Sequence, residues 1–315
     1  MKIIYGINHL KIKKPTVATI GIFDGIHRGH KKILRLLKNI ARETKAKSCV
    51  LTFHPHPSKI LHPHRTPPML ISTKHKLNLL AQESIDIAIL INFTKDFAGI
   101  NPVRFAEEVL VKRMNVRGLL VGKNFLFGKD KSGTVKSLYR LSRRFGFKVH
   151  VIQPLKLDGK IISSTLIRRV IMSGELDRAK ELLGRDVSIL GTVTEGAKRG
   201  RILGFRTANL DLHHEAVPPS GVYIVKVKLE NEECRGILNI GFQPTFKKEK
   251  VREERTTEVH IFNFNKSIYG KDIEVIFLKR IRSERRFKNK ECLLLRIKKD
   301  AEIAKRYFRS RENNP

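Results

Sequence analysis

The sequence predicts an α/β domain with a doubly wound parallel sheet, followed by an antiparallel β-barrel and a C-terminal helix. Over roughly the first 155 residues, short apolar runs alternate with segments that carry apolar residues at helical spacing, which is typical of βαβ units. From Val187 onward, short apolar runs are separated only by turns, as in an antiparallel barrel or sandwich. This change of rhythm predicts two domains, residues 1–185 and 186–315.

The elements follow from these patterns in chain order. After an opening strand near the N-terminus, the strands expected in the first half are 16–23, 48–53, 85–93, 116–122 and 147–155. The helices expected between them are 31–43, 75–82, 105–114 and 135–146. In the second half the expected strands are 187–196, 221–230, 234–241, 257–264 and 273–281, and the last expected helix is 290–313.

Composition narrows the class of protein. Hydrophobic residues make up 41% of the 315, which is enough for a buried core. No run approaches the ~20 apolar residues that cross a bilayer, and the N-terminus lacks the pattern of a signal peptide. Three widely spaced cysteines without a CxxC pair argue against a disulfide framework and a zinc site, and predict a cytoplasmic location.

The charge balance is strongly basic. The 64 Lys and Arg residues against 30 Asp and Glu give a net charge of +34, which attracts polyanions. The lysines are spread along the whole chain, and no RRM, KH or zinc-finger signature accompanies them. We therefore expect a solvated basic surface, with nucleic-acid binding limited to non-specific electrostatics.

The stretch GIFDGIHRGH, residues 21–30, joins the second expected strand to a helix. Ligands of open α/β sheets lie beyond the carboxyl ends of the strands, and a helix N-terminus there attracts phosphate. Gly25 and Gly29 allow close approach of the backbone, and His27 and His30 can donate to one phosphoryl group during in-line attack. Asp24 instead could hold the turn together. A tight turn without ligand is the simpler alternative.

A second helix start carries hydroxyl groups and an arginine. In ISSTLIRR, Ser164 and Thr165 are candidate N-cap residues, and Arg168 follows one turn later, where it can bind the triphosphate of ATP or the leaving pyrophosphate. An ordinary capped helix with a surface arginine is equally compatible with these residues. The histidines of HPHPSKILHPHR, 54–65, are separated by prolines and lack acidic neighbours, so we expect them to shape a pocket edge and not to bind a metal.

In the second half, a glycine-rich basic segment predicts a phosphate-binding loop: GTVTEGAKRGRILGFRTANLDL (191–212). A glycine-rich basic turn between strands is the alternative for the same residues. Thr207 and Asn209 offer oxygen ligands for Mg²⁺ bridging ATP phosphates. The residues expected to contact phosphate are Gly196, Lys198, Gly200, Arg201 and Gly204.

These motifs together resemble the bacterial bifunctional riboflavin kinase/FAD synthetase family. GIFDGIHRGH is similar to its GxFDGxHxGH signature. Further similar segments follow in family order through both halves of the chain. They are TFHPHP, VGKNFLFGKDKSG, ISSTLIRRVIMSGELDRAKELLGR, GTVTEGAKRGRILGFRTANL, LNIGFQPTF and TEVHIFNFNKSIYGKDIEVIFLKRIRSERRF.

The resemblance implies phosphorylation of riboflavin to FMN in the second half and adenylylation of FMN to FAD in the first, with ATP as substrate and Mg²⁺ as cofactor. It implies that Glu258 is the base for the ribityl hydroxyl. It places Asn124, Phe125, Arg282 and Phe287 at the flavin.

The chain also departs from the family pattern. Asn124 and Asn263 replace the usual aspartates, Leu126 replaces a basic residue, and Arg206 replaces a proline that would rigidify the loop before Thr207. Three alternatives therefore stay open: an enzyme that retains one of the two activities, an HxGH transferase with another acceptor, or a nucleic-acid-binding protein on a degenerate scaffold.

Overall fold

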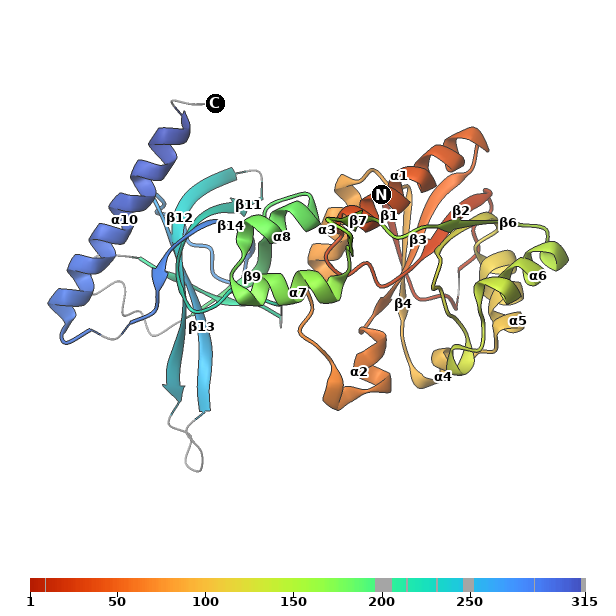
Figure 1. Ribbon diagram of the computed structural model, residues 1–315, viewed down its shortest axis with the longest axis horizontal. Helices are drawn as coiled ribbons and strands as arrows, with labels where there is room; N and C mark the ends of the chain where they lie inside the picture. The colour runs from red at the N-terminus through yellow and green to blue at the C-terminus, as the bar shows by residue number, and fades with distance from the viewer. Residues whose placement is uncertain are drawn as a thin grey trace. The chain divides into compact units, whose positions relative to one another are not determined.

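A computed structural model describes residues 1–8, 10–195, 206–213, 215–230, 232–245, 252–285 and 287–312 (Figure 1). The chain divides into two compact units. The first unit comprises Met1–Met69 and Thr73–Ser164, and the second comprises Leu70–Ser72 and Thr165–Pro315. Among the described helices, none combines the length and the apolar character that a membrane span requires.

The first unit is built on a six-stranded sheet in the order β1-β4-β3-β2-β5-β6, with all neighbours parallel. Its strands are β1 Lys2–Tyr5, β2 Thr16–Ile20, β3 Lys47–His54, β4 Ile87–Asn92, β5 Val116–Gly122 and β6 Lys148–Ile152. The main helices between them are α1 Arg28–Glu43, α3 Thr73–Gln82, η2 Phe105–Arg113 and α6 Val135–Phe145; short turns of helix are α2 Pro57–Leu61, α4 Lys95–Ala98 and α5 Pro102–Arg104.

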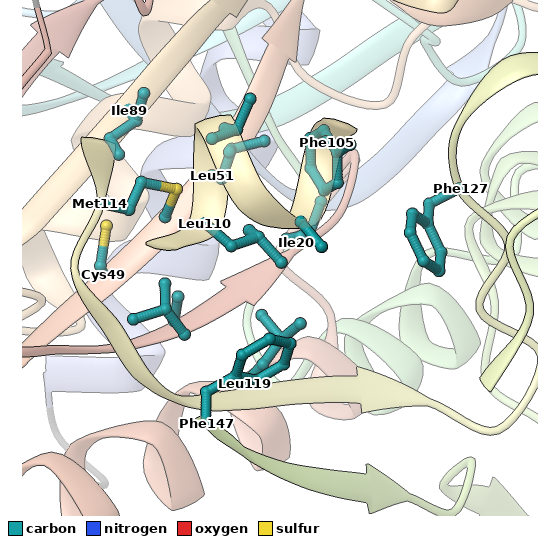
Figure 2. Close-up of a cluster of buried hydrophobic side chains, with 14 of the residues drawn as sticks. Ile20, Cys49, Leu51, Ile89, Phe105, Leu110, Met114, Leu119, Phe127 and Phe147 are labelled. Carbon is teal, nitrogen blue, oxygen red and sulfur yellow. The ribbon is translucent and has the colours of Figure 1, made fainter. Parts of the chain in front are cut away.

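Side chains alternate across this sheet. Ala18 and Ile20, for example, pack on the face covered by η2 and α6, together with Leu110 and Leu119. Figure 2 shows this cluster, in which Phe105 of η2 and Met114, which directly follows η2, lie over the strands. The opposite face carries α3, whose Leu77 packs against Ala88 and Leu90 of β4. Helices on both faces make the sheet doubly wound.

The order of the strands defines a switch point. The chain runs from β2 to β3 and β4 on one side of the sheet, and then crosses to β5 and β6 on the other. The connections that leave the carboxyl ends of β2 and β5 therefore diverge, which opens a crevice between them. Any ligand of this unit is expected there.

The second unit contains a closed six-stranded barrel in the order β10-β13-β12-β11-β14-β9, with antiparallel neighbours throughout. Tyr223 and Phe277 meet edge to face inside it, with ring centroids 5.3 Å apart. The strands are β9 Ser188–Thr194, β10 Ala208–Asp211, β11 Gly221–Leu229, β12 Glu232–Thr245, β13 Arg252–Ile261 and β14 Asp272–Ser283. Helices α7 Ser164–Ser173 and α8 Leu176–Leu183 precede them.

The long helix α10, Lys290–Glu312, lies against the outside of the barrel (Figure 1). Its Ala304 and Phe308 pack on Val222 and Ile224 of β11. Its buried Asp300 pairs with Arg282 Nε of β14 at 2.8 Å, and with Arg296 one turn earlier. Because burial of an unpaired carboxylate is costly, these ion pairs tie the helix to one position on the barrel.

The predicted fold class is confirmed. Every strand expected in the first half exists, and the second half closes into a barrel. Two details differ. The short strand β10 was not among the expected strands, and the expected helix 105–114 contains π-type turns, since Met114 N–H donates to the carbonyl of Val109 five residues back.

The packing of η2 on the sheet should carry a large share of the stability of the first unit. We expect Leu110→Ala, at a side chain with 0% exposure, to lower the free energy of unfolding by about 2–5 kcal/mol. Val103→Ala, at a 41% exposed position of the same unit, should change it by no more than about 0.5 kcal/mol. Urea unfolding followed by circular dichroism measures both; equal effects would contradict the assignment of Leu110 to the core.

Candidate functional site

The two histidines of the first half stack at the start of α1. Their ring centroids are 3.7 Å apart and the ring planes are inclined by 17°. His27 is the N-cap residue, and its Nδ1 accepts from the N–H of His30 at 3.3 Å. In neutral His27 the proton therefore resides on Nε2, which can donate to a ligand. Both rings lie at the positive end of the helix dipole, where a phosphate is stabilised.

The turn that leads to these histidines has an unusual backbone. Phe23, Gly25 and Ile26 have φ angles of 53°, 89° and 39°. For phenylalanine and the β-branched isoleucine this left-handed region is strained, and such strain persists only where surrounding contacts hold the chain in place. We call residues 22–27 the phosphate turn.

Three contacts hold the phosphate turn. Thr52 Oγ1 of β3 donates to the carbonyl of Ile22 at 3.1 Å, and Lys76 Nζ of α3 donates to the same oxygen at 3.0 Å. Ser164 Oγ donates to the carbonyl of Asp24 at 2.9 Å. Asp24 itself is 2% exposed, so its carboxylate belongs to the interior of the site.

Burial lowers the pKa of His30 well below its usual range, and the neighbouring His27 and Lys76 lower it further. His30 is therefore a neutral ring at pH 7. Its Nδ1 is buried and lacks a hydrogen-bond partner among the described residues, so the polar edge of the ring is not satisfied by the protein. A ligand that supplied hydrogen bonds here would be stabilised.

A cavity of about 840 Å³ opens at the carboxyl ends of β2, β3, β4 and β5. Its wall includes Gly21, Ile22 at the start of the phosphate turn, and the predicted flavin residues Asn124 and Phe125. Pro57 of the histidine-rich loop also lines it. A connected group of aromatic rings forms its apolar side: Phe53, Phe93, Phe97, Phe105, Phe125 and Phe127.

The remaining predicted residues of this site lie in the phosphate turn, on α1 and on α7. Gly25 is buried in the phosphate turn, and Gly29 lies beside the His27 ring. Ser164 contacts the turn as described, whereas Thr165 and Arg168 belong to the second compact unit. The role of Arg168 toward phosphate therefore stays a prediction.

In the barrel, three polar side chains occupy neighbouring positions on one face. The register of β10, β13 and β12 pairs Asn209 with Glu258, and Glu258 with Asn239. Directly paired residues in a sheet present their side chains on the same side. Thr207 lies one residue before the start of β10, so its place beside them stays a prediction. Asn239 was not predicted as a site residue, although it lies in the quoted LNIGFQPTF segment.

The predicted flavin residues of the second half lie together. The guanidinium of Arg282 lies 5.5 Å from the ring centroid of Phe287, on which Arg285 also stacks at 4.9 Å. Arg282 also forms the ion pair with Asp300, so it has a structural partner in addition to any flavin contact. Contact with a flavin stays a prediction for both residues.

The predicted phosphate loop of the second half, with Gly196, Lys198, Gly200, Arg201 and Gly204, lies outside the described residues. Across the described ranges, no three His, Cys, Asp or Glu side chains gather to hold a metal ion. Two histidines of 54–65 have side-chain hydrogen bonds: His54 bonds to Thr73, and His56 bonds to Ser58.

Comparison with known proteins decides the family. The FAD synthetase model matches residues 9–166 and the riboflavin kinase model matches residues 183–308. A bifunctional riboflavin kinase/FMN adenylyltransferase from Buchnera aphidicola (subsp. Schizaphis graminum) is 37% identical, over 98% of this chain and 99% of its own. The Bacillus subtilis protein of the same name is 38% identical, over 93% and 92%. The chain belongs to the bifunctional riboflavin kinase/FMN adenylyltransferase family.

A solved structure has the same fold over nearly the whole chain. It is described as a macrolide-efflux protein from Streptococcus pneumoniae, with a TM-score of 0.83 and 30% identity over 97% of this chain and 99% of that one. Within the family fold, sequence reasoning missed Lys76. A lysine that precedes Leu79 and Leu80 by helical spacing is the signal that could have indicated its burial.

The histidine stack depends on the absence of a side chain at position 29. A Cβ added to Gly29 would lie 3.1 Å from two atoms of the His27 ring. We expect Gly29→Ala to displace that ring and to lower the rate of FMN adenylylation by about tenfold or more. In Gly122→Ala the added methyl group meets nothing within 4 Å, so this control should keep its rate. A normal rate in the first variant would show that the stack is dispensable.

The lowered pKa of His30 links stability to pH. Below about pH 6.5 the His30 side chain is protonated in the unfolded chain but stays neutral in the folded protein. The unfolded state therefore binds more protons, and the free energy of unfolding decreases as the pH falls. We expect wild type to lose more stability between about pH 7 and pH 5 than His30→Asn does. Urea unfolding at a series of pH values measures the two slopes. Identical slopes would mean that His30 titrates normally in the folded protein.

Proposed function

We propose that each half of the chain carries one of the two activities of its family, with the boundary at residue 185. The chain is a riboflavin kinase and an FMN adenylyltransferase: it phosphorylates riboflavin to FMN and adenylylates FMN to FAD. One observation supports adenylylation in the first half: His27 and His30 stack at the N-terminus of a helix. The phosphate turn that precedes this helix borders the cavity.

In the first half, a phosphate oxygen of FMN attacks the α-phosphorus of ATP directly. The new P–O bond forms as the bond to pyrophosphate breaks, and no covalent enzyme intermediate is involved. His27 and His30 donate hydrogen bonds to the phosphoryl oxygens on which negative charge builds, and Arg168 binds the leaving pyrophosphate. Gly25, Gly29, Ser164 and Thr165 present backbone N–H and hydroxyl groups to the phosphates of ATP.

The cavity suits the flavin ring of FMN. Its wall of phenylalanine rings offers flat apolar surfaces to the isoalloxazine, while Asn124 supplies an amide for hydrogen bonding. A flavin held there extends its phosphate toward Ile22 and the phosphate turn. Leu126, which is 49% exposed on the same wall, adds apolar contact where the family pattern has a basic residue.

In the second half, Glu258 takes the proton from the ribityl hydroxyl of riboflavin as that oxygen attacks the γ-phosphorus of ATP, and ADP leaves. Thr207 and Asn209 would hold Mg²⁺, because a hydroxyl and an amide oxygen beside the Glu258 carboxylate form the all-oxygen donor set that this ion prefers. Mg²⁺ supplies charge neutralisation on the ATP phosphates. Arg282 and Phe287 contact the isoalloxazine.

Two further properties belong to this proposal. The three cysteines are free, which supports a location in the reducing cytoplasm. The net charge of +34 is the one observation in favour of nucleic-acid binding, and non-specific attraction accounts for it.

Two variants test the assignment of one activity to each half. Glu258→Gln should abolish conversion of riboflavin to FMN, at least about a hundredfold, while added FMN is still converted to FAD. His30→Asn should show the reverse, with FMN accumulating. Resolving the flavins formed from riboflavin, ATP and Mg²⁺ by chromatography measures both reactions in one sample.

The wild-type protein provides the reference for this experiment. If the wild-type protein made FMN only, Asn124 and Leu126 would be the first positions to restore to the family pattern. If it converted FMN to FAD but did not phosphorylate riboflavin, Arg206 would be the first position to restore. Loss of both activities in either variant would contradict the separation of the two sites.

A further inference from the structure

Lys76 is a lysine in the interior of the first unit. It lies on α3 with 2% exposure, whereas lysine is almost never fully buried without a partner. Its Nζ contacts three oxygens at the carboxyl edge of the sheet: the carbonyl of Ile22 at 3.0 Å, Thr52 Oγ1 at 3.3 Å and the carbonyl of Phe53 at 3.4 Å. One ammonium group therefore joins the connection after β2 to the end of β3.

These contacts meet at a segment of the chain with strained backbone angles. Ile22 precedes Phe23 and Ile26, whose backbones are strained. Thr52 also donates to the carbonyl of Ile22, so Lys76, Thr52 and Ile22 form a closed set of hydrogen bonds under the phosphate turn. A buried ammonium also offsets the negative ends of the carbonyl groups, which otherwise repel a phosphate placed above them.

We propose that Lys76 is a positioning residue for adenylyl transfer: its ammonium group holds the phosphate turn in the strained conformation that stacks His27 on His30. This inference rests on the proposed function of the first half. It assigns no contact with substrate to Lys76. The lysine acts through the turn, and its loss should reduce turnover more than binding of FMN, because the phenylalanine wall of the cavity is left intact.

The ammonium group of Lys76 loses its proton within a pH range that is convenient for kinetic measurements. Burial lowers the pKa of Lys76 to about 8, against the opposing effect of Asp24 in the phosphate turn. Among the described groups, His30 of α1 and His54 of β3 also sense this ammonium, which lowers the pKa of both. Deprotonation above pH 8 removes the charge and one of three N–H donors, so the support of the turn should weaken in alkaline solution.

The test compares Lys76→Met, Lys76→Arg and Lys38→Met in the full chain. Lys38 is the matched control, because its Nζ also donates to a backbone carbonyl, that of Glu83 at 2.7 Å, which lies outside the phosphate turn. We expect Lys76→Met to lower kcat for FMN adenylylation about a hundredfold, with KM for FMN changed less than about threefold. Lys38→Met should keep kcat within about twofold, and Lys76→Arg should recover part of the loss.

A pH series on the wild-type protein, with Lys76→Arg as the comparison, gives a second measurement. Wild-type kcat for adenylylation should fall between about pH 7 and pH 9.5, with a midpoint near 8, and this fall should be absent in Lys76→Arg, since arginine stays charged. Wild-type kcat that is constant over this range would overturn the proposal. So would equal losses in Lys76→Met and Lys38→Met, or a loss confined to KM. Absence of FAD from the wild-type protein at pH 7 would instead contradict the proposed function.

Discussion

The first half of the chain depends on a strained turn that several distant residues hold in place. Phe23 and Ile26 adopt backbone angles that ordinary residues avoid, and the turn between β2 and α1 exists in this form because its carbonyl groups are bonded from β3, α3 and the start of α7. The cost of the strain is offset by these bonds and by the burial around them. In return, two imidazole rings are fixed at the end of a helix before any substrate arrives.

Pre-organisation of this kind matters most for a reaction without a covalent intermediate. Phosphoryl and nucleotidyl transfer need positioning and charge stabilisation more than chemical groups from the protein. The barrel uses a different device for the same purpose. There, the fixed register of three strands places Asn209, Glu258 and Asn239 in one row, so hydrogen bonds of the sheet and not a strained turn set the spacing of the polar groups.

Much of the fold could be predicted because local patterns determine it. The buried strands are apolar runs, and α1 shows helical spacing at Leu34, Leu37 and Ala41. The strand β10 was not predicted, since ANLD is only four residues long; it becomes a strand by pairing with β9 and β13. The histidines were found through their motif. Lys76 was not, because helical spacing could indicate its burial but not its partner Ile22, which is 54 residues away.

The place of β1 in the sheet has a consequence for how the protein is made. β1 pairs with β4, about 85 residues later in the chain, while β2 and β3 pair with each other as soon as both have left the ribosome. During synthesis β1 must therefore remain unpaired until the central strands have assembled. As an edge strand of four residues beginning with a lysine, it presents little surface for pairing with another chain during that interval.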